Sequence, residues 1–132
     1  MHDAVRYVLQ TPQERIPMLL AIPYENNELY QHFGNTPEFK LYHIEDKQIT
    51  STELLPTNGQ SHVQLIGILL DAHITALAAG EIGSLAICLL NDQDVNVYTG
   101  LHGNPDDIAQ TIAKGELQPN NEPTHQCGCQ HA

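Results

Sequence analysis

The chain has 132 residues, of which 41% are hydrophobic and 5% aromatic, with no tryptophan, so it suits one domain with a mainly aliphatic core. Sixteen acidic residues against five basic ones give a net charge of −11, which opposes binding to nucleic acids and to anionic membranes. No apolar run approaches the roughly 20 residues that cross a bilayer, and no basic-then-apolar leader opens the chain, so we expect a cytoplasmic protein.

The first half of the chain predicts strands rather than helices. A continuous apolar run between two prolines suits a buried strand, and the Asn- and Gly-rich stretch after it is typical of a loop. Further on, one segment alternates its side chains, and a turn near Asp46 and Lys47 joins it to a segment rich in β-branched residues. The expected strands span residues 18–23, 39–46 and 47–55.

The second half predicts helices that alternate with short strands. Apolar positions recur at helical spacing after Ser61, which suits a helix N-cap, and again after Gly80 and Gly83. The last helix has Asn104 as its expected N-cap and Gly115 as its stop. The expected helices span 62–73, 80–94 and 104–117, and the expected strands between them span 74–79 and 95–100.

This order of elements implies a mixed sheet. The early hairpin must be antiparallel, whereas strands separated by helices pair in parallel through right-handed crossovers. The fold class is therefore α/β, with a sheet of about five strands flanked by helices. We expect residues 18–117 to form the domain, residues 1–17 an extension, and residues 118–132 a flexible tail without an apolar face.

The triplet His32-Phe33-Gly34 lies in the loop after the first strand. Phe33 is expected to anchor the loop in the core, and Gly34 to allow a backbone conformation that other residues resist. The imidazole of His32 would then be held at a fixed, exposed place, as a metal or cluster ligand requires. The triplet alone also fits an ordinary loop histidine that bonds to a nearby carbonyl.

Four further histidines and one cysteine lie within the expected domain. His62 lies at the same expected edge of the sheet as the triplet, and His102 lies in a loop after the last strand, where binding sites are common. His73 is expected to complement a helix dipole, and His43 to be structural or exposed. Cys88, in an apolar helical run, is expected to be a buried inert thiol.

The pair Gly80 and Gly83 has two interpretations. The glycines either expose the amides of a helix start to an anion or let that helix pack tightly against the sheet. The sequence leaves both open.

The C-terminal tail carries four metal-binding side chains at alternate positions: His125, Cys127, Cys129 and His131. The spacing differs from the Cys-x-x-Cys pairs of structural zinc sites, and a reducing cytosol disfavours a disulfide. The four side chains can meet on one Zn²⁺ or other soft metal ion if the peptide curls at Gly128. The alternative is a frayed end that binds metal weakly and by accident.

The segment LAIPYENNELYQHFGNTPEFKLYHIED resembles the opening of the dinitrogenase iron–molybdenum cofactor biosynthesis family. Members have a strand that ends in a proline, a His-Phe-Gly loop and a strand with a phenylalanine. AAGEIGSLA is similar to the family's Gly-x-Ile-Gly turn, and VNVYTGLHG and AKGEL also follow the family pattern. The resemblance covers about residues 18–117. Two features depart from it: many relatives have a Gly-His-Gly loop where this chain has Ser61-His62, and the first 17 residues have no counterpart.

The resemblance implies a ribonuclease-H-like three-layer fold that binds or carries an iron–sulfur or iron–molybdenum cluster, with His32 as a candidate ligand. It also implies metallocluster or cofactor-assembly proteins as partners. The candidate cluster-binding residues are His32, Phe33, Gly34, His62, Gly80, Gly83 and His102.

Two other functions are alternatives to cluster carriage. A nuclease on such a scaffold needs carboxylates that converge on Mg²⁺, one of them in the first strand, and residues 18–23 contain none, so we expect no enzyme. A generic metallochaperone or metal-sensing module for Zn, Cu or Ni, acting through the tail, is the alternative.

Overall fold

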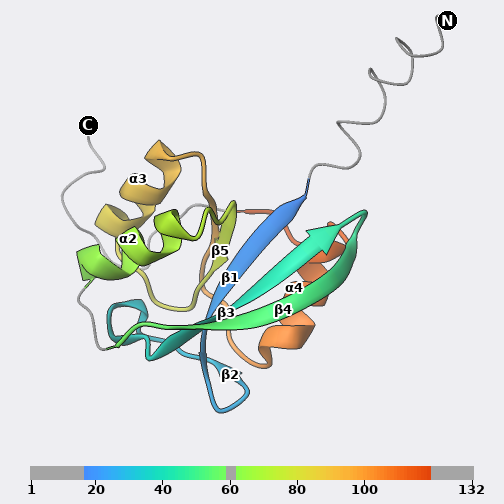
Figure 1. Ribbon diagram of the computed structural model, residues 1–132, viewed down its shortest axis with the longest axis horizontal. Coiled ribbons are helices and arrows are strands. Elements are labelled where there is room, and N and C mark those ends of the chain that lie inside the picture. The colour runs from blue at the N-terminus through green and yellow to red at the C-terminus, as the bar shows by residue number, and fades with distance from the viewer. Residues whose placement is uncertain (1–16, 59–61, 120–132) are drawn as a thin grey trace, which may run out of the picture.

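The computed structural model describes residues 17–58 and 62–119, which form one mixed sheet with helices on both faces (Figure 1). Its strands are β1 (Met18–Glu25), β2 (Glu28–Leu29), β3 (Glu38–Glu45), β4 (Gln48–Pro56), β5 (Ala76–Ala78) and β6 (Asn96–Tyr98). Its helices are the short 3-10 helix η1 (Phe33–Asn35) and the α-helices α2 (His62–Asp71), α3 (Ser84–Asp92) and α4 (Pro105–Ala113).

The strand order is β4-β3-β1-β5-β6, and β2 pairs with the end of β1. β3 runs antiparallel to β1 and β4, whereas β5 is parallel to β1 and β6 is parallel to β5. The predicted α/β class, the early hairpin and the later parallel strands are confirmed. The sheet has six strands rather than the five expected.

The additional strand, β2, lies where a loop was expected. Asn26 and Asn27 form the turn before it with φ values of 52° and 66°, a left-handed backbone that asparagine tolerates better than most residues. β1 also continues through Pro23, where it was expected to end. β5 pairs only with Leu20 and Ala21, so the missing N–H of Pro23 interrupts no parallel ladder.

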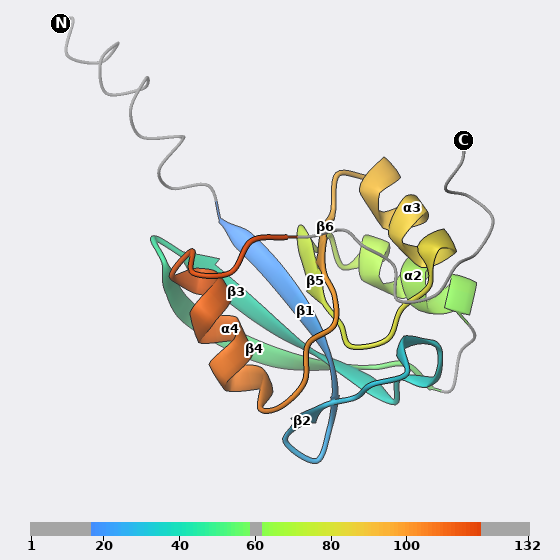
Figure 2. The same cartoon turned by 180° about the vertical axis from the view of Figure 1, so that it is seen from behind.

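Helices cover both faces of the sheet, which gives three layers (Figure 2). α2 and α3 pack on one face, and α4 packs on the other. Alternation along β3 places Phe39 and Leu41 in the core beneath α2 and α3, and Tyr42 and Ile44 in the core beneath α4. Within the two described ranges, no helix is both long enough and apolar enough to span a membrane.

The ends of the last helix agree with the sequence signals. Asn104 Oδ1 accepts hydrogen bonds from the amides of Asp106 at 2.8 Å and Asp107 at 3.2 Å. Gly115 follows the helix with a φ of 78°, which favours glycine. His73 lies just beyond α2, as expected, with a φ of 64°. The extension, most of the tail and the N-cap expected before α2 fall outside the described residues.

α4 is attached to the sheet through the carboxylate of Asp106. Tyr42 Oη donates to it at 2.7 Å and Lys40 Nζ at 3.0 Å. The ammonium of Lys40 also lies over the rings of Tyr24 and Tyr42, 5.5 and 5.4 Å from their centroids. The hydrogen bonds from Tyr42 and then Lys40 lower the pKa of Asp106. Burial, followed by the bond to Asp106, raises the pKa of Tyr42.

The Asp106 contact predicts a loss of stability in acid. Because the folded state lowers the pKa of Asp106, the contact stabilises the fold above the unfolded pKa and is lost as pH falls through the lower folded value. We expect Asp106→Asn to reduce the free energy of unfolding at about pH 7 and to differ less from the parent at about pH 3, as measured by urea unfolding. Asp107→Asn removes the same charge one residue along α4 and serves as the control. If the free energies of unfolding of Asp106→Asn and the parent differ by the same amount at both pH values, the prediction is contradicted.

Candidate functional site

Three loops meet at the carboxyl ends of β1, β5 and β6, the edge at which open α/β sheets bind ligands. The loop after β5 is bonded to the other two. Glu81 N donates to the carbonyl of Gln31 at 2.8 Å, and Phe33 N donates to the carbonyl of Glu81 at 3.2 Å. On the other side, Gly100 N donates to the carbonyl of Gly80 at 3.0 Å. The backbone itself therefore fixes the loop that carries the His-Phe-Gly triplet.

His32 and Glu81 form a side-chain pair at this junction. Their backbones make an isolated parallel bridge, so the two side chains leave neighbouring chains side by side. His32 Nδ1 lies 2.9 Å from Glu81 Oε1, and 64% and 44% of the two side chains are exposed. The imidazole is thus held and open to solvent, as the sequence predicted, but its partner is a carboxylate rather than a backbone carbonyl.

A pocket of about 190 Å³ lies beside this pair. Its lining consists of His32, Phe33, Gly34, Asn35, Glu81, Ile82 and Gly83. Phe33 is buried, and its ring centroid lies 5.9 Å from that of Phe39, so the triplet is anchored in the core as expected. Gly34 lies inside η1, where the backbone is one that any residue adopts. The expectation that the backbone at position 34 requires glycine is therefore wrong. The feature of Gly34 that can matter is its small size beside the pocket.

The pocket lies at the start of α3. Gly83 is the N-cap of α3 and lines the pocket. As a glycine, it has no side chain that could cap the helix. The N-terminal ends of α2 and α3 lie side by side near η1 (Figures 1 and 2). First-turn amides lack intrahelical acceptors and carry the positive end of the helix dipole, so this corner favours an anion.

The two glycines of the Gly-x-Ile-Gly turn have different roles. A Cβ on Gly80 would lie 2.3 Å from Gln31 Oε1, and Gln31 Nε2 donates to the carbonyl of Leu101 at 3.0 Å. Gly80 therefore leaves room for a side chain that joins the loop after β1 to the loop after β6. The close packing expected of Gly80 is against Gln31 rather than between helix and sheet. Of the two, Gly83 is the one that lines the pocket.

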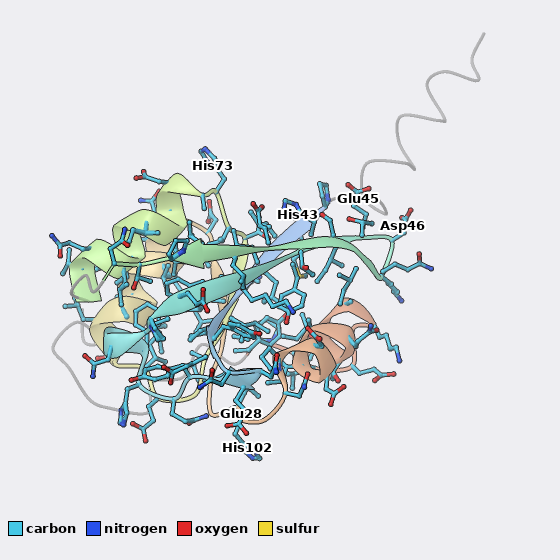
Figure 3. The ribbon with its side chains drawn as sticks, turned by 60° about the horizontal axis from the view of Figure 1, so that its bottom comes forward. Glu28, His43, Glu45, Asp46, His73 and His102 are labelled. Atoms are coloured by element: carbon cyan, nitrogen blue, oxygen red, sulfur yellow. The ribbon has the colours of Figure 1, made fainter. Side chains whose placement is uncertain are left out.

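Among the histidines whose side chains the structure describes, His43, His73 and His102 are absent from the pocket lining. His62 is the first residue of α2, and its side chain is outside the described part of the structure. His102 lies in the loop after β6, which is joined to β2 by a hydrogen bond from Leu29 N to the carbonyl of Gly103 at 2.9 Å (Figure 3). His43 and His73 lie on the opposite side of the molecule in the same view, and His43 Nε2 is 2.9 Å from Glu53 Oε2.

Two predictions concern cysteine chemistry. The tail ligands His125, Cys127, Cys129 and His131 lie outside the described residues, so the metal site expected there stays a prediction. Cys88 is half-buried and disulfide-bonded, and the expectation of a buried free thiol is wrong. Cys88 lies one helical turn after Leu85, which is 45% exposed, on a side of α3 that faces away from the core.

Among the side chains that the structure describes, no three from His, Cys, Asp or Glu are placed to hold a metal ion.

Glu81 is the charged residue of the pocket lining that the sequence did not single out as a candidate. It occupies the variable position of the Gly-x-Ile-Gly turn, where an acidic residue resembles ordinary surface composition. The available signal was topological. The turn and the His-Phe-Gly loop follow strands that were expected to end at one edge of the sheet. Side chains from the two segments are therefore expected to lie near each other.

Comparisons with known proteins agree with this fold. The family profile described as Dinitrogenase iron-molybdenum cofactor matches residues 17–115. The protein MJ0580 of Methanocaldococcus jannaschii is 23% identical over 106 residues, which cover 76% of this chain and 90% of that protein. The crystal structure of PH0822 is similar with a TM-score of 0.71 and 25% identity, and the match covers 78% of this chain and 95% of that one. The apo orange protein of Desulfovibrio gigas has a similar fold, with a TM-score of 0.64, 15% identity and coverage of 80% and 92%.

The packing at Gly80 predicts the effect of a single methyl group. We expect Gly80→Ala to lower the free energy of unfolding by about 1–2 kcal/mol, because the methyl displaces the Gln31 amide from its bond to Leu101. The control is Gly67→Ala in α2, where nothing lies within 4 Å of the added Cβ, and it should raise stability by about 0.5–1 kcal/mol. Chemical denaturation measures both changes. A Gly80→Ala variant as stable as the parent would show that Gln31 does not need this space.

Proposed function

The chain belongs to the dinitrogenase iron-molybdenum cofactor family, and from this we propose that it binds and carries an iron–sulfur or iron–molybdenum cluster during metallocofactor assembly. The cluster is cargo, and no catalytic step belongs to this role. The observation that carries the proposal is the pocket in which Glu81 holds His32 beside the N-terminal end of α3.

The pocket offers two kinds of contact to an anionic metal–sulfur cluster. The neutral imidazole of His32 is a suitable ligand for iron. The amides at the start of α3 suit the sulfides, which accept hydrogen bonds. Both contacts are local, and they offset the repulsion that a formal charge of −11 exerts on an anion.

The small number of protein ligands fits a carrier. Within the part of the chain that the structure describes, His32 is the one imidazole in the pocket lining, so we propose that most metal ions of a cluster keep their own sulfides as ligands. A cargo held by one side chain and by backbone amides is easier to release than one held by several thiolates. The role therefore requires protein partners that donate and accept the cluster, and cofactor-assembly proteins are the partners we propose.

The fold label and the domain limits also belong to this proposal. Among the five strands of the path β4-β3-β1-β5-β6, β3 alone runs opposite to the others, which supports a ribonuclease-H-like arrangement. The family match over residues 17–115 supports a cluster-binding domain at 18–117 between an extension and a tail. The acidic charge disfavours nucleic-acid partners, and we propose the cytoplasm as the location.

His32→Ala tests the site directly. The variant should bind isolated iron–molybdenum cofactor at least about tenfold more weakly, because the imidazole ligand is lost. Its free energy of unfolding should change by less than about 1 kcal/mol, because the side chain is mostly exposed. Binding is measured by anaerobic gel filtration and by iron and molybdenum analysis of the protein fraction.

His43→Ala is the control for His32→Ala, because it removes a histidine with an equally short contact, 2.9 Å, to a glutamate outside the pocket. It should bind the cofactor as the parent does. Failure of the parent to retain iron and molybdenum would refute carriage of the iron–molybdenum cofactor. Equal retention by His32→Ala and the parent would remove His32 from the site.

The alternative function is a metallochaperone or metal-sensing module for Zn, Cu or Ni that acts through the tail. The alternation of His125, Cys127, Cys129 and His131 favours it. Thiolates are the metal-binding form of cysteine, and the disulfide at Cys88 requires that metal binding be measured under reducing conditions.

The tail hypothesis predicts that Cys127→Ser/Cys129→Ser loses most of the tight Zn²⁺ binding, because a hydroxyl is a far poorer ligand than a thiolate. The affinity of the parent should fall as pH drops below about 6.5, where imidazole protonates. Competition with a chromophoric chelator in reductant measures both effects. Unchanged stoichiometry and affinity in the double variant would leave the tail without a role in metal binding.

A further inference from the structure

We propose that Glu81 positions the imidazole of His32 by keeping its proton on Nδ1, so that Nε2 is the atom presented to a metal. The identity of the metal ligand rests on the cluster-carrying role proposed above. The orientation of the imidazole rests on the contacts around Glu81. Glu81 is a positioning residue here, because it acts through His32.

The backbone of Glu81 is hydrogen-bonded to the residues immediately before and after His32. Its N–H donates to the carbonyl of Gln31 at 2.8 Å, and its carbonyl accepts from the N–H of Phe33 at 3.2 Å. His32 therefore lies between two residues that are both bonded to Glu81. This backbone bridge does not involve the Glu81 side chain, so a substitution there changes the contact to His32 and leaves the junction of the loops in place.

The contact between the side chains determines which ring nitrogen carries the proton. Glu81 Oε1 lies 2.9 Å from His32 Nδ1, and an ionised carboxylate can only accept a hydrogen bond. A neutral His32 must therefore donate from Nδ1, which leaves the lone pair on Nε2. Carboxylates orient metal-binding histidines through this type of contact. The His32 side chain is mostly exposed and that of Glu81 is partly exposed, so the pair contributes a ring orientation rather than much stability.

A second pair in the same chain has the reverse geometry. In the pair formed by His43 and Glu53, it is Nε2 of the histidine that lies 2.9 Å from the carboxylate. The same reasoning places the proton of His43 on Nε2. One molecule therefore contains two histidine–glutamate pairs of equal length with opposite expected tautomers, one at the pocket and one outside its lining.

Long-range ¹H–¹⁵N spectra of the full-length apo protein at about pH 8 read the tautomers directly. We expect the parent to show the proton on Nδ1 at His32 and on Nε2 at His43. Glu81→Leu should abolish the preference at His32 alone, and Glu53→Leu should abolish it at His43 alone. Glu81→Gln should keep the His32 tautomer, because its amide oxygen still accepts the bond.

Binding of isolated iron–molybdenum cofactor completes the test. Glu81→Leu should weaken binding at least about tenfold, the usual effect of losing a residue that orients a metal ligand, while Glu81→Gln and Glu53→Leu should bind as the parent does. A proton on Nε2 of His32 in the parent, which needs no variant to observe, would overturn the assignment. Full affinity in Glu81→Leu would overturn it too. If the parent binds no cofactor, the carrier role fails, and the apo spectra still decide whether Glu81 fixes the ring.

Discussion

The parallel pairing of β1 with β5 is the constraint on which the candidate site depends. It makes the two strands end at one edge of the sheet, where an isolated parallel bridge joins His32, which follows β2, to Glu81, which follows β5. The pairing is stabilised from both faces. Leu20 and Ala76 are buried beneath α4, and their neighbours in the two strands are buried beneath α2 and α3. A core of small and aliphatic side chains thus brings together two polar residues that are distant in the sequence.

The distribution of charge limits how this protein can hold an anion. No lysine or arginine occurs between Lys47 and Lys114, a span that includes α2, α3 and the loops after β5 and β6. Lys40 is engaged with Asp106 beneath α4, away from the pocket lining. Within the described residues, the attraction that we propose comes from helix-start amides and from the imidazole of His32, both of which act at short range. Such a site can select an anion by shape and hydrogen bonding.

How far the sequence predicted the structure depended on the range of the signal. Local signals were dependable: Asn104 caps α4, Gly115 follows it, and β3 alternates between the two cores. Features that depend on a partner strand were not predictable in the same way. Pro23 continues β1 because β5 is too short to reach it, and β2 forms because Asn26 and Asn27 both accept a left-handed backbone.

The candidate site shows the same division. His32 and Phe33 were identified because their triplet is distinctive, and Gly83 because it opens a helix. The role of Glu81 depends on a contact between distant segments, and the setting of Cys88 depends on which side of α3 meets the core, so neither could be read from its neighbours in sequence.

The central claim is that the His32 pocket is where a metal cluster binds. Titration of the ¹⁵N-labelled protein with isolated iron–molybdenum cofactor tests it most directly, because iron broadens nearby amide signals. The account predicts broadening first in η1 and the first turn of α3, whereas broadening confined to other parts of the chain, or none at all, would contradict it.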